Sequence, residues 1–134
     1  VEDSLHLWNL LKVQIKQEYG SMIVVTEDAA IEATRLNKQG TSILPTRLTE
    51  SLLQSISGID GTILLDPYGF CHAFGVILDG EVNDACTPSR GSRYNSAVRY
   101  VYSEGRRALA LVASDDKTID IIPLINILFL KFVV

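Results

Sequence analysis

Residues 59–80, IDGTILLDPYGFCHAFGVILDG, decide the fold class of this chain. Two β-rich runs, residues 59–65 and 70–78, flank the tetrapeptide DPYG at residues 66–69. Aspartate at the first turn position, proline at the second and glycine at the fourth match the preferences of a type I turn. The stretch therefore predicts a β-hairpin.

Helical and strand-like segments surround this hairpin. Apolar spacing and turn residues predict helices over residues 3–18, 27–40 (with Thr26 as N-cap), 46–58 and 92–103. Further strands are expected at residues 21–25, 108–113 and 118–122, and a polar loop at residues 81–90. Strands interleaved with helices predict an α/β fold, a single layered domain with a central mixed β-sheet flanked by helices.

A length of 134 residues is that of one domain. We assign residues 1–122 to this domain and treat residues 123–134 as an apolar strand, or as a linker or partner-binding segment. The run LINILFLKFVV is about half the ~20 residues that cross a bilayer, so we expect no membrane span. The absence of an initiator methionine suggests a fragment of a longer protein.

The charge distribution favours a small anionic ligand. The net charge of −4 argues against nucleic-acid binding, which usually needs a broad basic face. Five of the seven arginines nevertheless lie within residues 90–107. We expect Arg99 to form a surface or structural ion pair, and Arg106 and Arg107 to be solvated.

The cysteines and the N-terminus indicate a cytoplasmic location. Cys71 and Cys86 lack zinc-site spacing, and we interpret them as reduced, buried thiols. Residues 1–9 are polar and acidic, unlike a signal peptide.

Three short motifs carry the candidate chemistry. Asp60-Gly61-Thr62 places a carboxylate at the mouth of a strand, although a simple turn has the same composition. Residues 91–95, GSRYN, open the helix expected at 92–103, with Ser92 as its cap. Unpaired N–H groups and an arginine in the first turn of a helix suit a phosphate. Ser114 begins the acidic turn SDD after a strand. Ligands often bind at such strand ends in open α/β sheets, although a simple surface turn has the same sequence pattern.

In order and approximate spacing, these motifs resemble the diadenylate cyclase domain family, which includes the N-terminal domain of the DNA integrity scanning protein. That family carries Asp-Gly-Ala at the start of a strand hairpin and Gly-Thr-Arg-His-Arg at the head of a helix. A strand ending in a Ser-acidic-acidic turn follows. The resemblance extends from about residue 22 to residue 122.

The resemblance implies a specific reaction. Two ATP molecules would lie face to face between two such domains, in a homo-oligomer. Each 3′-hydroxyl would attack the α-phosphate of the other ATP, forming cyclic di-AMP and releasing pyrophosphate. Asp60 would hold Mg²⁺ or Mn²⁺ and help deprotonate the hydroxyl. The implied nucleotide-binding residues are Gly61, Thr62, Gly91, Ser92, Arg93, Tyr94, Asn95 and Ser114.

Three departures from the family motifs matter: Thr62 replaces the alanine of Asp-Gly-Ala, and two more lie in the helix motif of the family. Its histidine is Tyr94 here, and its second arginine is Asn95, which lacks a fixed charge and a bidentate phosphate contact. Three hypotheses follow: an active diadenylate cyclase, a nucleotide or second-messenger sensor without turnover, and a protein-interaction module that uses the apolar C-terminal segment.

Overall fold

The strand β1 (Ser21–Val25) is a run of five buried residues, as expected for a strand covered on both faces. It belongs to a computed structural model that describes residues 2–17, 20–38 and 40–123. The remaining strands of the described part are β2 (Thr41–Arg47), β3 (Thr62–Leu65), β4 (Phe70–Val76), β5 (Leu109–Ala113) and β6 (Ile119–Ile122). Its helices are α1 (Glu2–Ile15), α2 (Ala29–Arg35), α3 (Glu50–Ile56) and α4 (Ser92–Val101).

Within the described ranges these strands form one mixed sheet in the order β2-β4-β3-β1-β5-β6. β1 runs parallel to β3, with Met22 opposite Thr62, and antiparallel to β5, with Ser21 opposite Ala113. The start of β1, the start of β3 and the end of β5 therefore meet at one edge of the sheet. We call this end of the three strands the β1-start edge.

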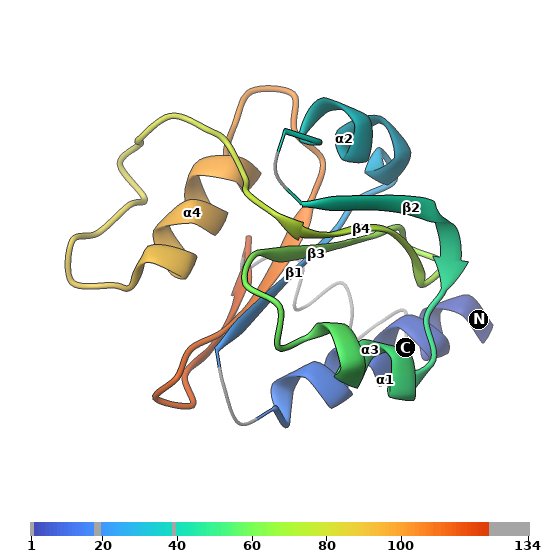
Figure 1. Cartoon of the computed structure of the whole chain (residues 1–134). Coiled ribbons are helices and arrows are strands. Elements are labelled where there is room, and N and C mark those ends of the chain that lie inside the picture. Colours follow the sequence, from blue (N-terminus) through green and yellow to red (C-terminus); the bar gives the residue numbers. More distant parts are fainter. Residues whose placement is uncertain (1, 18–19, 39, 124–134) are drawn as a thin grey trace.

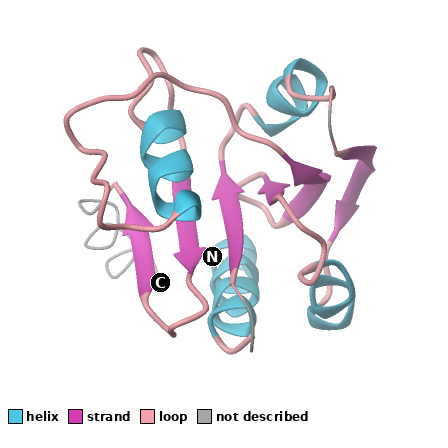
Figure 2. Cartoon of the chain, turned by 60° about the vertical axis from the view of Figure 1, so that its left-hand side comes forward, coloured by secondary structure: helices cyan, strands magenta, loops and turns pink. Residues whose placement is uncertain are grey.

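Helices cover both faces of the sheet (Figure 1). α2 and α4 pack on one face around a core that includes Val24, Leu64 and Tyr100. α1 and α3 pack on the other face, around Ile23 and Leu111. This three-layer arrangement, visible from a second side in Figure 2, confirms the predicted α/β class.

The predicted hairpin is present between β3 and β4. Asp66 Oδ1 accepts hydrogen bonds from the N–H groups of Tyr68 (2.9 Å) and Phe70 (3.1 Å). Gly69 takes a positive φ of 87° and donates its N–H to the Asp66 carbonyl. The turn residues named by the sequence thus form the turn, and β3 begins at Thr62 rather than at residue 59.

The prediction of one helix over residues 46–58 was wrong at its start. Residues 41–47 form the edge strand β2, and α3 begins at Glu50 after its N-cap Thr49, whose side chain accepts from the Leu52 N–H. Pro45 is tolerated in β2 because its pairing with β4 is interrupted between Ser42 and Thr46. Pro45 marks an irregular edge strand, not a helix start.

Three smaller predictions also change. The N-cap of α2 is Asp28, while the Thr26 hydroxyl accepts from the Asp28 N–H and donates to the Arg107 carbonyl. Arg106 is not solvated, because it hydrogen-bonds to buried Glu32. Cys71 is a buried free thiol, but the free thiol of Cys86 is only partly buried. Residues 124–134 of the apolar segment lie outside the described residues.

Candidate functional site

The β1-start edge collects most of the predicted site. Ser114 directly follows β5, and its N–H donates to the Thr118 carbonyl at 2.9 Å, which closes the turn to β6. The N-terminus of α4 lies beside this turn. Residues of both segments line a pocket of about 420 Å³, which includes Gly91, Ser92, Arg93, Tyr94 and Ser114.

The first turn of α4 presents unpaired backbone donors to this pocket. Gly91 is the N-cap, and the first intrahelical bond joins the Asn95 N–H to the Gly91 carbonyl. The N–H groups of residues 92–94 therefore have no acceptor within the helix. The predicted Ser92 cap is wrong, since no side chain caps this helix and Ser92 is its first residue. An uncapped helix start beside a pocket is suited to an anion.

Arg93 adds positive charge at the same place. Its guanidinium lies against Gly20, just before β1, where an added Cβ would meet Arg93 Nη1 at 2.4 Å. Asp115 is its acidic neighbour, with 3.9 Å between Arg93 Nη1 and Asp115 Oδ2, and this Asp115 carboxylate also accepts the Gly20 N–H at 2.6 Å. Arg93 is about two-fifths exposed, so its charge remains accessible to a ligand.

Arg90 and Tyr94 form one wall of the pocket. Arg90 Cζ lies 3.9 Å from the centroid of the Tyr94 ring, a cation–π contact. Arg90 Nη2 also hydrogen-bonds to Asp120 Oδ2 on β6. Tyr94 is thus an aromatic platform for a second arginine.

The acidic turn of the pocket carries a carboxylate with a perturbed pKa. Asp116 is exposed and accepts the Thr118 N–H through Oδ1 at 3.0 Å. Hydrogen bonding to Thr118 lowers the pKa of Asp116 below its usual range. The site therefore combines two arginines with acidic side chains at its rim.

Asn95 does not face the pocket. Its Oδ1 accepts the Thr87 N–H at 2.9 Å, and its Nδ2 donates to the carbonyls of Thr87 (2.8 Å) and Arg90 (3.3 Å). The amide is fully occupied by backbone, and Asn95 is absent from the pocket lining. The sequence alone gave no sign of these contacts.

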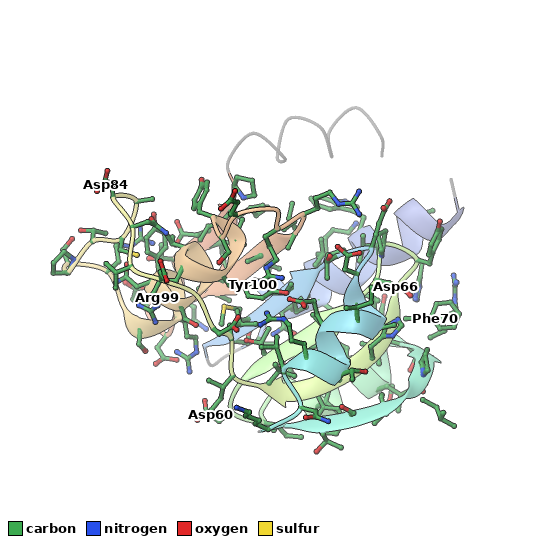
Figure 3. All side chains as sticks on the ribbon, turned by 90° about the horizontal axis from the view of Figure 1, so that it is seen from above. Asp60, Asp66, Phe70, Asp84, Arg99 and Tyr100 are labelled. Atoms are coloured by element: carbon green, nitrogen blue, oxygen red, sulfur yellow. The ribbon has the colours of Figure 1, made fainter. Side chains whose placement is uncertain are left out.

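Asp60 lies on the β1-start edge but outside the pocket wall. It precedes β3 as Gly20 precedes β1, and Figure 3 shows it at the rim of the domain, at the opposite end of β3 from Asp66. Asp60 is exposed, and no hydrogen bond or ion pair joins its carboxylate to another described residue. The carboxylate is free to meet a ligand.

Gly61 and Thr62 have structural roles next to Asp60. Gly61 has a φ of +110°, and a Cβ there would lie 2.5 Å from the Gly75 carbonyl carbon. Thr62 is 1% exposed, and its hydroxyl is buried without a hydrogen-bond partner. Only glycine fits between β3 and β4 at position 61.

The far end of α4 is fixed by a buried charge network. Glu32 of α2 accepts from the Tyr100 hydroxyl and from Arg106 Nη1, both at 2.6 Å, and from Arg35 Nε at 2.7 Å. Hydrogen bonding from Arg35 lowers the pKa of Glu32, while burial raises the pKa of Tyr100. Arg35 also pairs with Asp79. The network joins α2, α4 and the segment before β5, which holds the helix in place over the sheet.

Asp60 belongs to no cluster of three or more potential metal ligands in the described part of the chain. Among residues 2–17, 20–38 and 40–123, no group of three or more His, Cys, Asp or Glu side chains could hold a metal ion. Mg²⁺ at nucleotide sites is commonly held by one or two carboxylates together with phosphate oxygens and water. An exposed, unengaged Asp60 is compatible with that arrangement.

Comparisons with known proteins agree with this fold. No protein-family model and no curated protein matches the chain. A double mutant of DacA, a diadenylate cyclase from Staphylococcus aureus, superposes with a TM-score of 0.67 and 17% identity. The match covers 90% of this chain and 80% of DacA. The chain therefore has a fold like that of this diadenylate cyclase.

A second solved structure supports the same fold. A hypothetical membrane-spanning protein from Bacillus cereus superposes with a TM-score of 0.63 and 24% identity, over 90% of this chain and 59% of its own. In this chain, none of the helices within the described ranges has the length and apolar character needed to cross a bilayer.

Proposed function

We propose that this domain binds an adenine nucleotide along the β1-start edge and condenses two ATP molecules into cyclic di-AMP. The observation that carries the proposal is the pocket at the start of α4. It joins free helix N–H groups and Arg93 on the same sheet edge as the unengaged Asp60. The diadenylate cyclase fold supports the choice of ATP.

In this proposal the phosphates lie against α4 and Arg93. Backbone donors and the positive end of a helix dipole favour an anion there, and Arg93 supplies a partly exposed charge. The nucleotide then extends past Gly20, against which Arg93 packs, toward Asp60.

The chemistry is a transfer at phosphorus between two nucleotides. The 3′-oxygen of one ATP forms a bond to the α-phosphorus of the other, and the bond to the β-phosphate oxygen breaks, releasing pyrophosphate. Asp60 would hold Mg²⁺ or Mn²⁺, which neutralises phosphate charge when bound. The Asp60 carboxylate also receives or relays the hydroxyl proton. Repeating the step on the second ATP closes the ring, so two copies of the domain must face each other.

The free thiols of Cys71 and Cys86 are compatible with a cytoplasmic setting for this reaction.

A nucleotide sensor without turnover is the second candidate. The contacts of Asn95 favour it, because the position of the family's second arginine contributes no charge to the pocket. Binding relies on Arg93 and the helix start and would survive this change, whereas charge stabilisation in the transition state would be weaker.

A binding experiment tests the phosphate site. ATP titrated into the 134-residue chain should raise its Tm, and Arg93→Ala should weaken binding about 10- to 100-fold, the loss of one charge-assisted contact. Arg107→Ala is the matched control, because Arg107 is exposed at the opposite sheet edge. Gly20→Ala should weaken binding without lowering the Tm, since its Cβ displaces only flexible side chains. Equal effects of the two arginine changes would refute the site.

A turnover experiment separates the cyclase from the sensor. ATP with Mg²⁺ or Mn²⁺ should yield cyclic di-AMP, detected by chromatography and mass, and Asp60→Asn should abolish it while nucleotide binding persists. Asp84→Asn, an exposed loop acid, is the control (Figure 3). Binding without product would support the sensor, and product formed by Asp60→Asn would remove Asp60 from the reaction. Sedimentation with and without ATP tests the face-to-face dimer.

A further inference from the structure

The connection between β4 and α4, residues 77–91, is longer than most loops in compact domains. Figure 1 shows that this loop extends beyond α4 and then returns to the start of that helix. Several of its hydrogen bonds are local, such as Ala85 N–H to Asn83 Oδ1 and Cys86 N–H to the Asn83 carbonyl. These local contacts do not tie the loop to the helix.

The side chain of Asn95 links the loop to the helix by hydrogen bonds. Its side-chain amide pairs with both the N–H and the carbonyl of Thr87, as a neighbouring strand would, and reaches the Arg90 carbonyl as well. A backbone amide outside a helix or sheet needs such a partner. The side-chain hydrogen bonds that hold the end of the loop to the first turn of α4 therefore come from Asn95.

The hydrogen bonds of Asn95 determine where Arg90 lies. The Arg90 N–H donates to the Thr87 carbonyl at 3.1 Å, so Thr87 and Arg90 bracket one tight turn. From this turn the Arg90 side chain lies over Tyr94, reaches Asp120 and lines the pocket. A release of Thr87 would free the backbone that carries Arg90.

We propose that Asn95 is a positioning residue that fixes the turn at residues 87–90 and thereby presents Arg90 to the phosphates of the bound nucleotide. The phosphate part rests on the proposed function. Arg90 then takes the place of the family's second arginine, with its guanidinium supplied from the loop rather than from the helix. The charge missing at position 95 is restored by Arg90, which Asn95 holds in position.

The first test uses the chain without nucleotide. In Asn95→Ala, the Thr87 amide should exchange with solvent at least tenfold faster by NMR. The Arg90 Nε–H signal should lose the shift caused by the Tyr94 ring current. Asn95→Leu has a similar size but neither accepts nor donates a hydrogen bond, and it should show the same changes if Asn95→Ala fails to fold. Asn83→Ala, which removes a local loop contact, should leave both signals unchanged. Unchanged signals in both Asn95 variants overturn the positioning role.

The second test measures ATP affinity below the unfolding range of each variant. Asn95→Ala and Arg90→Ala should each raise the Kd about tenfold, and the double variant should bind no worse than either single variant, because both remove the same contact. Additive losses, or an unchanged Kd in Asn95→Ala, overturn the link to Arg90. A wild-type chain that binds no nucleotide overturns the proposed function and the phosphate part, and the NMR signals still decide whether Asn95 positions Arg90.

Discussion

Replacing Glu32 with glutamine tests whether one buried charge holds α2 and α4 together. Glu32 is 3% exposed and accepts hydrogen bonds from Tyr100, Arg106 and Arg35. Glutamine has almost the same shape, but it carries no charge and turns one acceptor oxygen into a donor that faces an arginine. Packing is therefore kept while the electrostatics change.

The contacts give the size of the effect. A hydrogen bond to a charged group contributes about 1.5–3 kcal/mol and a neutral one about 0.5–1.5 kcal/mol, so each donor loses roughly 1 kcal/mol. Three donor side chains give about 3 kcal/mol, and solvent recovers part of this at the partly exposed Arg35. We expect the free energy of unfolding to fall by about 2–3 kcal/mol, or roughly 10 °C in Tm for a domain of this size.

The pH dependence has a definite sign. The Arg35 hydrogen bonds lower the pKa of folded Glu32 below its ordinary value of 4.5, with Tyr100 and Arg106 adding to the effect. A group with a lowered folded-state pKa stabilises the protein fully above its unfolded pKa, and this stability is lost as the pH falls through the folded value. The difference between wild type and Glu32→Gln should stay constant from pH 6 to 8 and shrink below pH 4.5.

Thermal and urea unfolding of the 134-residue chain measure this difference. Glu27→Gln is the matched control, because Glu27 is exposed, and it should change the free energy of unfolding by less than about 0.5 kcal/mol. A Glu32→Gln variant within 1 kcal/mol of wild type at pH 7 would refute the assigned charge network. A difference that did not shrink in acid would refute its electrostatic origin.

Two further predictions concern a glycine and the thiols. Gly61→Ala should destabilise the domain by about 3 kcal/mol or more in urea unfolding, because it combines a positive φ with a clash against the Gly75 backbone. Gly105 has a φ of +73° but open space around it, so Gly105→Ala should lower the free energy of unfolding by only about 1 kcal/mol, from backbone strain. An equal loss of stability in the two variants would contradict the clash at Gly61. Burial raises the pKa of Cys71 to about 11, so at pH 8 a thiol reagent should modify Cys86 first; faster modification of Cys71 in the folded chain would disprove this.

Features set by adjacent residues could be predicted from the sequence. The hairpin turn depends on Asp66 and Gly69 within a few residues of each other, and β1 is a short apolar run whose burial follows from its composition. β2 was missed because its edge position, which tolerates Pro45, is a property of the sheet and not of residues 41–47.

In the candidate site, too, only the features set by adjacent residues could be predicted from the sequence. The start of α4 and the turn at Ser114 were visible as consecutive motifs. Gly20 and Asp120 were missed because they join the site from the segment before β1 and from β6, and only the strand order brings them there. The role of Asn95 depends on where a long loop returns, which no local pattern encodes.

The central position of β1 has a consequence for how the chain folds. β1 is complete by residue 25, yet one of its two partners, β5, is made about 90 residues later. Pairing between such distant segments is slow, because a large loop must close before any contact forms. During synthesis, β1 therefore has an unpaired side until β5 has been made. An unpaired strand can form hydrogen bonds with a strand of another chain. A chain that stops before Leu109 would keep this side of β1 unpaired permanently and should aggregate, so β5 acts as the closing step of assembly.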